Sequence, residues 1–306
     1  MHFFGPHKNA LEAAKIKKGF PWWLIVIFAF STLPIYYISI FGIAAFTCIA
    51  LKLTGFGYAY DELMASPLLD DIGLYFTLFD IIATLIFARV IDKIRLKQLG
   101  LKKEKFAVRY LVGLIAGFAM FSASVFMAKL FGAVEFSASP DAELAYILIM
   151  IPGWIIQGFS EEFLCRGFVM TAIAKRYSTF WGVFINSAVF AAMHSFNTGL
   201  TPLALFNLFL FGIFASIVFL ISENIWFVAA VHSVWNFTQG NFYGIPVSGN
   251  AVNPATTFFL TSFVPGKDLF NGGSFGIEGG ICDTVIHIIA IVIAYIIYRK
   301  KHPELK

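Results

Sequence analysis

The chain has 306 residues, of which 59% are hydrophobic and 13% are charged, and its formal net charge at pH 7 is +4. Soluble domains usually carry about 25% charged residues. The composition therefore excludes an ordinary soluble protein and indicates an integral membrane protein. The small basic excess does not indicate a nucleic-acid partner.

Apolar segments recur along the whole chain. An α-helix needs about 20 apolar residues to cross a hydrocarbon core of roughly 30 Å. The sequence predicts an all-α fold, a polytopic transmembrane helical bundle of about eight spans, with spans at 21–51, 72–92, 107–132, 144–174, 180–197, 202–221, 225–241 and 280–298. Residues 1–20 are then a basic cytoplasmic N-terminal segment, 21–298 a single integral membrane domain and 299–306 a cytoplasmic tail.

Basic and acidic residues alternate between the loops. Cytoplasmic loops of membrane proteins carry an excess of lysine and arginine, and acidic residues, among them Asp61, Glu62, Glu135 and Asp141, fall in the loops between the basic ones. We therefore expect both termini to be cytoplasmic. The basic residues that support this orientation are Lys8, Lys15, Lys17, Lys18, Lys93, Arg95, Lys97, Lys102, Lys103, Lys105, Lys175, Arg176, Arg299, Lys300 and Lys301.

The stretch GFSEEFLCRGF, at 158–168, places three charged residues inside an apolar segment. Charges within a membrane span cost several kcal/mol and usually serve a function. Glu162 and Arg166 are an i, i+4 pair in the favourable order, whereas Glu161 points about 140° away from Arg166 on a helix. Glu162 is therefore expected to be neutralised by Arg166, and Glu161 is left as a candidate proton acceptor.

A second polar residue, His194 in FAAMHSF, is expected at the same depth as Glu161. If 144–175 is one helix of about 30 residues, Glu161 lies roughly 21 Å above Lys175. His194 lies 15 residues beyond Thr179, on the returning helix, and reaches a similar height. The two side chains are thus expected to meet inside the membrane.

A third pair, His232 and Asn236 in HSVWNF, lies on one face of the seventh predicted span. An imidazole and an amide side by side can donate two hydrogen bonds to a developing oxyanion. Counting from Glu223 places His232 about 13 Å deep, roughly 8 Å short of Glu161. The seventh span must therefore start deeper or tilt if His232 is to join Glu161.

These three motifs, E-E-x-x-x-R, F-x-x-x-H and H-x-x-x-N, occur in this order on successive apolar segments within about 144–240. The pattern resembles the CPBP family of intramembrane endopeptidases, which includes type II CAAX prenyl proteases, bacteriocin-processing and self-immunity proteins and lysostaphin-resistance-like proteins. The resemblance implies that Glu161 activates water with help from His194, and that His232 and Asn236 hold the oxyanion. It implies a supporting role for Glu162 and Arg166.

The resemblance also implies a membrane-associated peptide or protein as substrate. The stretches GIPVSG at 244–249 and GGSFGIEGG at 272–280 are similar to glycine-rich loops of bacterial members, which predicts a bacterial cytoplasmic membrane. The zinc-binding pattern H-E-x-x-H is absent. We therefore expect no cofactor, with Glu161, His194 and His232 as the alternative set of three zinc ligands.

Particular residues also fit other functions. Gly158-x-Ser160 is reminiscent of the G-x-S-G motif of rhomboid serine proteases with His232 as base, although Glu161 stands where rhomboids have glycine. Intramembrane Glu, His and Asn residues also occur in secondary transporters, which show paired repeats and broken helices, and a non-catalytic scaffold or immunity protein would use the same fold. Neither paired repeats nor matching breaks are visible in this sequence.

The remaining polar or reactive residues are expected to have structural roles. Asp80 is expected to form a hydrogen bond with a neighbouring helix. Asp283 and His287 are expected to cap the start of the last span, where an aspartate suits the helix dipole. The cysteines lack C-x-x-C spacing and are expected to be buried free thiols: Cys48, Cys165 and Cys282.

Overall fold

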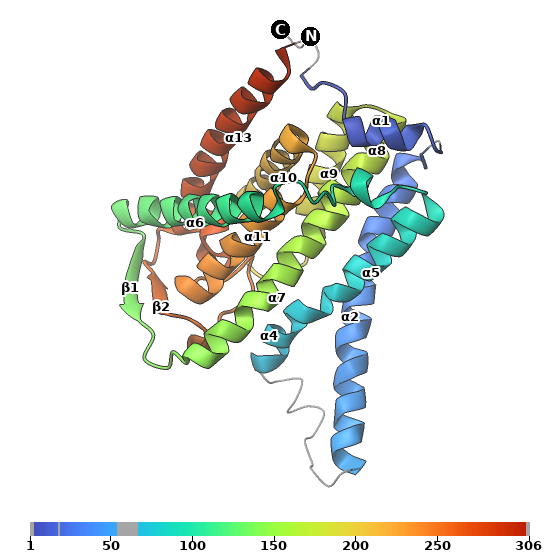
Figure 1. The fold of residues 1–306 in the computed structure, drawn as a ribbon. Helices are drawn as coiled ribbons and strands as arrows, with labels where there is room; N and C mark the ends of the chain where they lie inside the picture. The colour runs from blue at the N-terminus through green and yellow to red at the C-terminus, as the bar shows by residue number, and fades with distance from the viewer. Residues whose placement is uncertain (1–2, 18, 54–66, 304–306) are drawn as a thin grey trace.

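The structure, a computed structural model, describes residues 3–17, 19–53 and 67–303. It is a bundle of helices with one small two-stranded sheet (Figure 1), which confirms the expected all-α architecture. The principal elements are α1 (Lys8–Ala14), α2 (Trp22–Leu53), α4 (Pro67–Phe76), α5 (Leu78–Ile86), η1 (Phe87–Ile91), η2 (Leu96–Leu99), α6 (Phe106–Leu130), β1 (Val134–Ala138), α7 (Leu144–Glu162), η3 (Phe163–Met170), α8 (Thr171–Arg176), α9 (Thr179–Met193), α10 (Pro202–Ser222), α11 (Trp226–Phe237), η4 (Thr238–Phe242), β2 (Phe259–Phe263), α12 (Asp268–Asn271) and α13 (Ile281–Lys301).

Six helices of the described chain are long and apolar enough to cross a membrane. Two of the eight expected spans, the fifth and the seventh, are not among these six. The fifth, α9, ends at Met193 because the chain turns at 194–200, where Gly199 has a φ of +74°, before Thr201 caps α10. The seventh is a 12-residue α-helix continued by the π-helix η4 as far as Phe242. The six long segments are Trp22–Ala50, Ile72–Ile91, Phe106–Leu130, Leu144–Arg176, Pro202–Ser222 and Ile281–Lys301.

The expected long fourth helix is present. The elements α7, η3 and α8 form one continuous run of 33 residues, Leu144–Arg176. Its middle part, the π-helix η3, has every residue buried. Glu161 and Lys175 therefore lie on one continuous helical run, far apart along its axis, as predicted.

Helix α11 lies between α6 and α7, and the three backbones approach closely. A Cβ atom added at Gly117 of α6 would lie 2.5 Å from the Val231 carbonyl oxygen, and one added at Gly158 of α7 would lie 2.7 Å from the Ser233 backbone nitrogen. Figure 1 shows α6 running across the bundle over α11. Because only glycine permits these contacts, the side chains beside Ser233 are held against those of α7.

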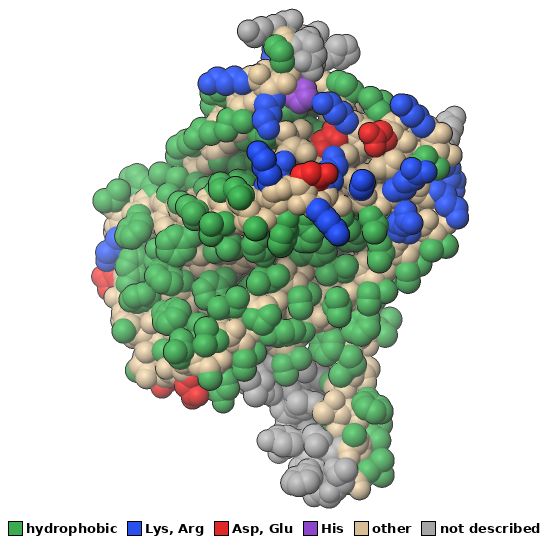
Figure 2. Space-filling view, viewed as in Figure 1, with side chains coloured by type: hydrophobic (Ala, Val, Ile, Leu, Met, Phe, Trp, Pro, Cys, Tyr) green, Lys and Arg blue, Asp and Glu red, His purple; other side chains and the backbone are tan. Residues whose placement is uncertain are grey.

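Lysine and arginine side chains gather at the end of the molecule where both termini lie (Figures 1 and 2). The ends of the chain also contact each other there. The Gly5 backbone N–H donates to the Tyr298 hydroxyl at 2.8 Å, and the Phe4 and Tyr298 rings pack with centroids 5.9 Å apart. This distribution agrees with the alternation of basic and acidic loops, while the cytoplasmic orientation stays a prediction. Asp61 and Glu62 lie outside the described residues.

Opposite this basic end, the long connections of the chain pack on one another. Strands β1 and β2 pair antiparallel, from Val134 with Phe263 to Ala138 with Phe259. The three cysteines are free and buried, as expected. The main apolar core lies between these two ends, around η3, α9, α10 and α11.

The basic N-terminal segment forms the helix α1, which docks on the protein. Asn9, Ala10 and Ala13 are buried. The Glu223 carboxylate accepts hydrogen bonds from the Lys8 and Asn9 backbone N–H groups, and His7 Nδ1 lies 3.5 Å from Glu223 Oε1. A carboxylate at a helix N-terminus is favourable because the first N–H groups lack partners within the helix.

Glu223 makes the docking of α1 dependent on pH. Burial acts to raise the pKa of Glu223, but hydrogen bonds and charge from His7, with the two backbone N–H groups, lower the pKa below its usual value. A lowered pKa in the folded state contributes stability above the ordinary glutamate pKa, and this contribution is lost as pH falls through the lowered value.

We expect Glu223→Gln to weaken α1 docking at pH 7 by about 1–2 kcal/mol, since the charged acceptor of two hydrogen bonds is lost. The difference from the wild-type protein should vanish as pH falls through the Glu223 pKa. Hydrogen exchange of the α1 amides, corrected for intrinsic rates at each pH, measures this. An equal difference at acid and neutral pH would contradict it.

Candidate active site

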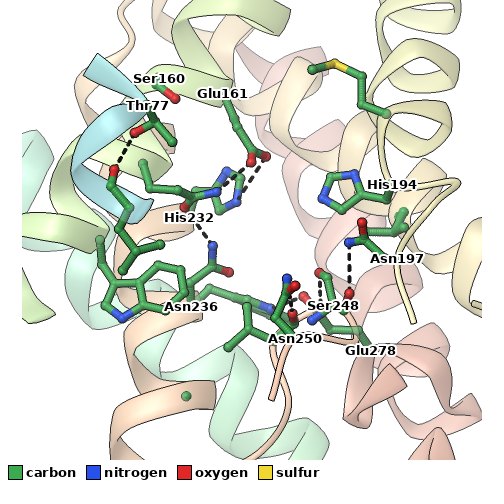
Figure 3. Close-up of a pocket in the computed structure, with 18 of the residues that line it drawn as sticks. Thr77, Ser160, Glu161, His194, Asn197, His232, Asn236, Ser248, Asn250 and Glu278 are labelled. Carbon is green, nitrogen blue, oxygen red and sulfur yellow. Dashed lines mark hydrogen bonds and ion pairs between the residues drawn. The ribbon is translucent and has the colours of Figure 1, made fainter. Parts of the chain in front are cut away.

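A cavity of about 480 Å³ lies inside the helix bundle, and the four predicted catalytic side chains all line it. Glu161 comes from α7, His194 from the end of α9, and His232 and Asn236 from α11. Figure 3 shows Glu161 and His232 close together, with His194 on another side of the same space. Three separate helices thus deliver these groups to one cavity.

Next to the cavity, a line of ionisable side chains connects α7 with α11. Arg166 Nη1 donates to Glu162 Oε1 at 2.8 Å, and the same oxygen lies 2.9 Å from His232 Nδ1. On the other side of the ring, His232 Nε2 lies 3.8 Å from Glu161 Oε2. The expected pairing of Glu162 with Arg166 is confirmed, and His232 reaches the depth of Glu161 because Gly158 lets α11 approach α7.

The Arg166 guanidinium is fully buried and stacks on aromatic rings as well as pairing with Glu162. Its central carbon lies 4.7 Å from the centroid of the Phe190 ring and 5.7 Å from that of Phe211. Such contacts stabilise a cation that has few hydrogen-bond acceptors. The Phe190 ring also packs against His194 and His232, at 5.0 and 5.9 Å between centroids. The phenylalanine of F-x-x-x-H therefore holds Arg166 and both histidines together.

His194 is oriented by its own helix. Its Nδ1 lies 2.9 Å from the Phe190 carbonyl oxygen, which can only accept a hydrogen bond. Nδ1 therefore carries the proton of a neutral ring, and Nε2 keeps its lone pair. A neutral imidazole in this tautomer can accept a proton from a water molecule in the cavity.

Gln157, one helical turn before Glu161, is a site residue that the sequence analysis missed. Its amide nitrogen donates to Glu161 Oε1, and its amide oxygen accepts from Asn236 Nδ2 at 2.9 Å. Gln157 thus links the glutamate of the first motif to the asparagine of the third. The i, i+4 spacing from Glu161 was the available signal.

Loops that follow α11 form another wall of the cavity, centred on Glu278. This carboxylate accepts hydrogen bonds from Trp235 Nε1 at 2.9 Å, from Gln239 at 3.2 Å, and from the backbone N–H and hydroxyl of Ser248 at 2.9 and 2.8 Å. It fixes the stretches 244–249 and 272–280 against α11. Glu278 was not singled out from sequence, although it lies inside the second glycine-rich stretch.

The structure changes the roles expected for the Asp283–His287 pair and for Asp80. Asp283 and His287 are buried, line the cavity and lie 3.0 Å apart, and Asp283 accepts a hydrogen bond from Ser124 of α6, so the pair joins two helices besides standing at the start of α13. Asp80 also lines the cavity, and its buried Oδ1 has no hydrogen-bond partner in the described part of the chain. The hydrogen bond expected for Asp80 is therefore not found at this oxygen.

The alternative zinc ligands, Glu161, His194 and His232, do not form a preorganised metal site in the described residues. In residues 3–17, 19–53 and 67–303, no three His, Cys, Asp or Glu side chains are placed to hold a metal ion. We therefore derive no step through a metal.

Ser160 lines the cavity, as a serine nucleophile would. Its expected base, His232, has both ring nitrogens facing glutamate oxygens, from Glu162 and from Glu161. The hydrogen bond at Nδ1 and the Glu161 carboxylate near Nε2 do not favour His232 as the base of a serine nucleophile.

The fold and this cavity define an integral membrane protein with a charged site lined by helices and loops. Within the chain, residues 143–238 match the family described as type II CAAX prenyl endopeptidase Rce1-like. This match confirms the resemblance to the CPBP family, and it contains all three motifs. A comparison of the chain with curated proteins found no match.

The buried ion pair of Arg166 and Glu162 predicts that its loss lowers the stability of the protein strongly. Arg166→Met is expected to destabilise the protein by about 3–5 kcal/mol, because it leaves Glu162 buried without its cation. Unfolding in mixed micelles, followed by circular dichroism, measures this. As the matched control, Arg176→Met removes an arginine at the basic end of the same helical run and is expected to cost much less. Equal losses from both variants would contradict the prediction.

Proposed function

We propose that this protein is an intramembrane endopeptidase that hydrolyses a peptide bond of a membrane-associated protein or peptide. The observation that carries the proposal is the meeting of Glu161, His194, His232 and Asn236 at one cavity inside the bundle. The family match to endopeptidases over the same residues supports it. We place the protein in a bacterial cytoplasmic membrane with both termini cytoplasmic, as the loop charges favour.

Glu161 is suited to activate water. Its side chain as a whole is 24% exposed, and its Oε2 atom is buried and accepts no hydrogen bond from the described residues. In the proposed reaction this oxygen takes a proton from a water molecule, with His194 Nε2 accepting a hydrogen bond from the same water. The water oxygen then forms a bond to the carbonyl carbon of the substrate.

His232 and Asn236 are suited to stabilise the negative oxygen of the tetrahedral intermediate. Asn236 Nδ2 has two hydrogens, one of which is donated to Gln157, so the second is available. With His232 Nδ1 donating to Glu162, its Nε2 can donate to the oxyanion when the ring carries two protons. As the C–N bond breaks, Glu161 returns its proton to the leaving amine.

Glu162 and Arg166 position His232 in this mechanism. The carboxylate fixes the ring through Nδ1, and the guanidinium compensates the carboxylate charge. Neither side chain appears among those that line the cavity, so each acts through another residue.

The central prediction concerns Glu161. Glu161→Gln is expected to lower proteolysis in purified, detergent-solubilised protein by about a hundredfold to ten-thousandfold, the range of general acid–base catalysis. Cleavage of a panel of fluorogenic membrane peptides measures this, with circular dichroism to verify folding. Undiminished cleavage would refute the role of Glu161.

Ser160→Ala is the matched control, since Ser160 is adjacent in sequence and lines the same cavity. We expect it to retain activity within a few-fold of the wild-type protein. If Ser160→Ala abolished cleavage while Glu161→Gln did not, a serine mechanism would replace the glutamate mechanism.

The proposed mechanism uses no metal. We expect activity to survive exhaustive chelation, and elemental analysis of active protein to show no stoichiometric zinc. Loss of activity on chelation that is restored by zinc, but not by calcium, would overturn the metal-free mechanism.

A further inference from the structure

We propose that Asp80 binds a basic side chain of the substrate, so that the enzyme selects peptides with a lysine or arginine near the bond that is cut. The inference rests on the function proposed above and adds a substrate class to it. The residue comes from the second span, outside the three motifs and outside the region that matches the family.

Asp80 lies at the depth of the catalytic glutamate. The two spans are tied at their basic ends by a buried ion pair, with Lys175 Nζ 2.9 Å from Asp92 Oδ1. Asp80 precedes Asp92 by 12 residues and Glu161 precedes Lys175 by 14, which places them about 18 and 21 Å from that pair. Helix α5, which carries Asp80, packs against α7, which carries Glu161.

Asp80 differs from the other three carboxyl groups that line the cavity. Glu161 accepts from Gln157, Glu278 accepts from four donors, and Asp283 accepts from Ser124 and lies beside His287. Asp80 Oδ1 is buried and accepts no hydrogen bond from the described residues. An unpaired carboxylate inside a membrane protein is costly, so a functional partner is the default expectation.

The surroundings of Asp80 fit a cation. No lysine or arginine of the described chain lines the cavity, although the protein as a whole has a net charge of +4. Three of the six residues that α2 contributes to the lining are aromatic, namely Tyr36, Tyr37 and Phe41. Aromatic faces attract ammonium and guanidinium groups and cover their aliphatic stems. A basic side chain thus supplies the charge that the cavity lacks.

The test measures binding separately from cleavage. The probes are apolar peptides of about 20 residues, each with a single lysine, norleucine or glutamate scanned through the central positions and a fluorophore at one end. Binding to the protein in lipid nanodiscs is followed by anisotropy. At the best position, the lysine peptide is expected to bind the wild-type protein at least about tenfold more tightly than the norleucine peptide.

Substitutions of Asp80 test whether this residue causes the preference for the lysine peptide. Asp80→Asn is expected to bind the lysine and norleucine peptides equally, Asp80→Lys to prefer the glutamate peptide, and Asp80→Glu to keep the lysine preference. Asp268→Asn, which removes an exposed carboxylate that does not line the cavity, is the matched control and is expected to behave as wild type.

A wild-type protein without lysine preference, or an Asp80→Asn variant that keeps it, would overturn the proposal. A shift in the pH profile of cleavage in Asp80→Asn, without any change in peptide selectivity, would instead show that Asp80 shares a proton with Glu161. Lysine-selective binding without cleavage by any variant would refute the proposed protease function while sustaining the role of Asp80.

Discussion

One buried carboxylate, that of Glu162, holds the site together. A single oxygen of Glu162 contacts both Arg166 and His232, and therefore joins the fourth span to the seventh. A buried carboxylate is tolerated only when it is paired and hydrogen-bonded. The position of His232 beside Glu161 follows from this requirement, because the imidazole is one of the two partners that Glu162 needs.

Close helix packing makes that interaction possible. A Cβ atom at Gly158 or Gly117 would lie 2.5 to 2.7 Å from atoms of α11, which is too close, so α11 would have to move away from α7 and α6. Small residues at such contacts are typical of membrane bundles, in which packing and not the hydrophobic effect drives association. The charged motif and the glycines beside it thus form one structural unit, since the first needs the short distance that the second permits.

Sequence alone predicted the parts of the site that follow from helical geometry. The pairing of Glu162 with Arg166 depends only on i, i+4 spacing, and the common depth of Glu161 and His194 depends only on residue counts and a long helix. The depth of His232 could not be predicted in the same way. It is fixed by the crossing of three helices, and counting residues along one helix cannot predict how that helix crosses the others.

The roles of three further residues that line the cavity could not be predicted from local sequence patterns. Gln157 and Glu278 are ordinary polar residues in sequence, and their roles arise from partners that are 79 and 30 to 43 residues away. Asp80 was interpreted as a structural residue because sequence could not show that its carboxylate faces a cavity. Periodicity predicts which face of a helix a residue occupies but not what lies opposite.

The hydrogen bond between Gly5 and Tyr298 joins the N-terminal segment to the last helix, α13. The first residues of the described chain are anchored to the last helix, so α13 cannot swing outward without pulling the N-terminal segment and α1 with it. Loosening either extremity therefore loosens both. The same helix that is tied to the N-terminal segment near its last turn carries Asp283 and His287 to the wall of the cavity near its first turn.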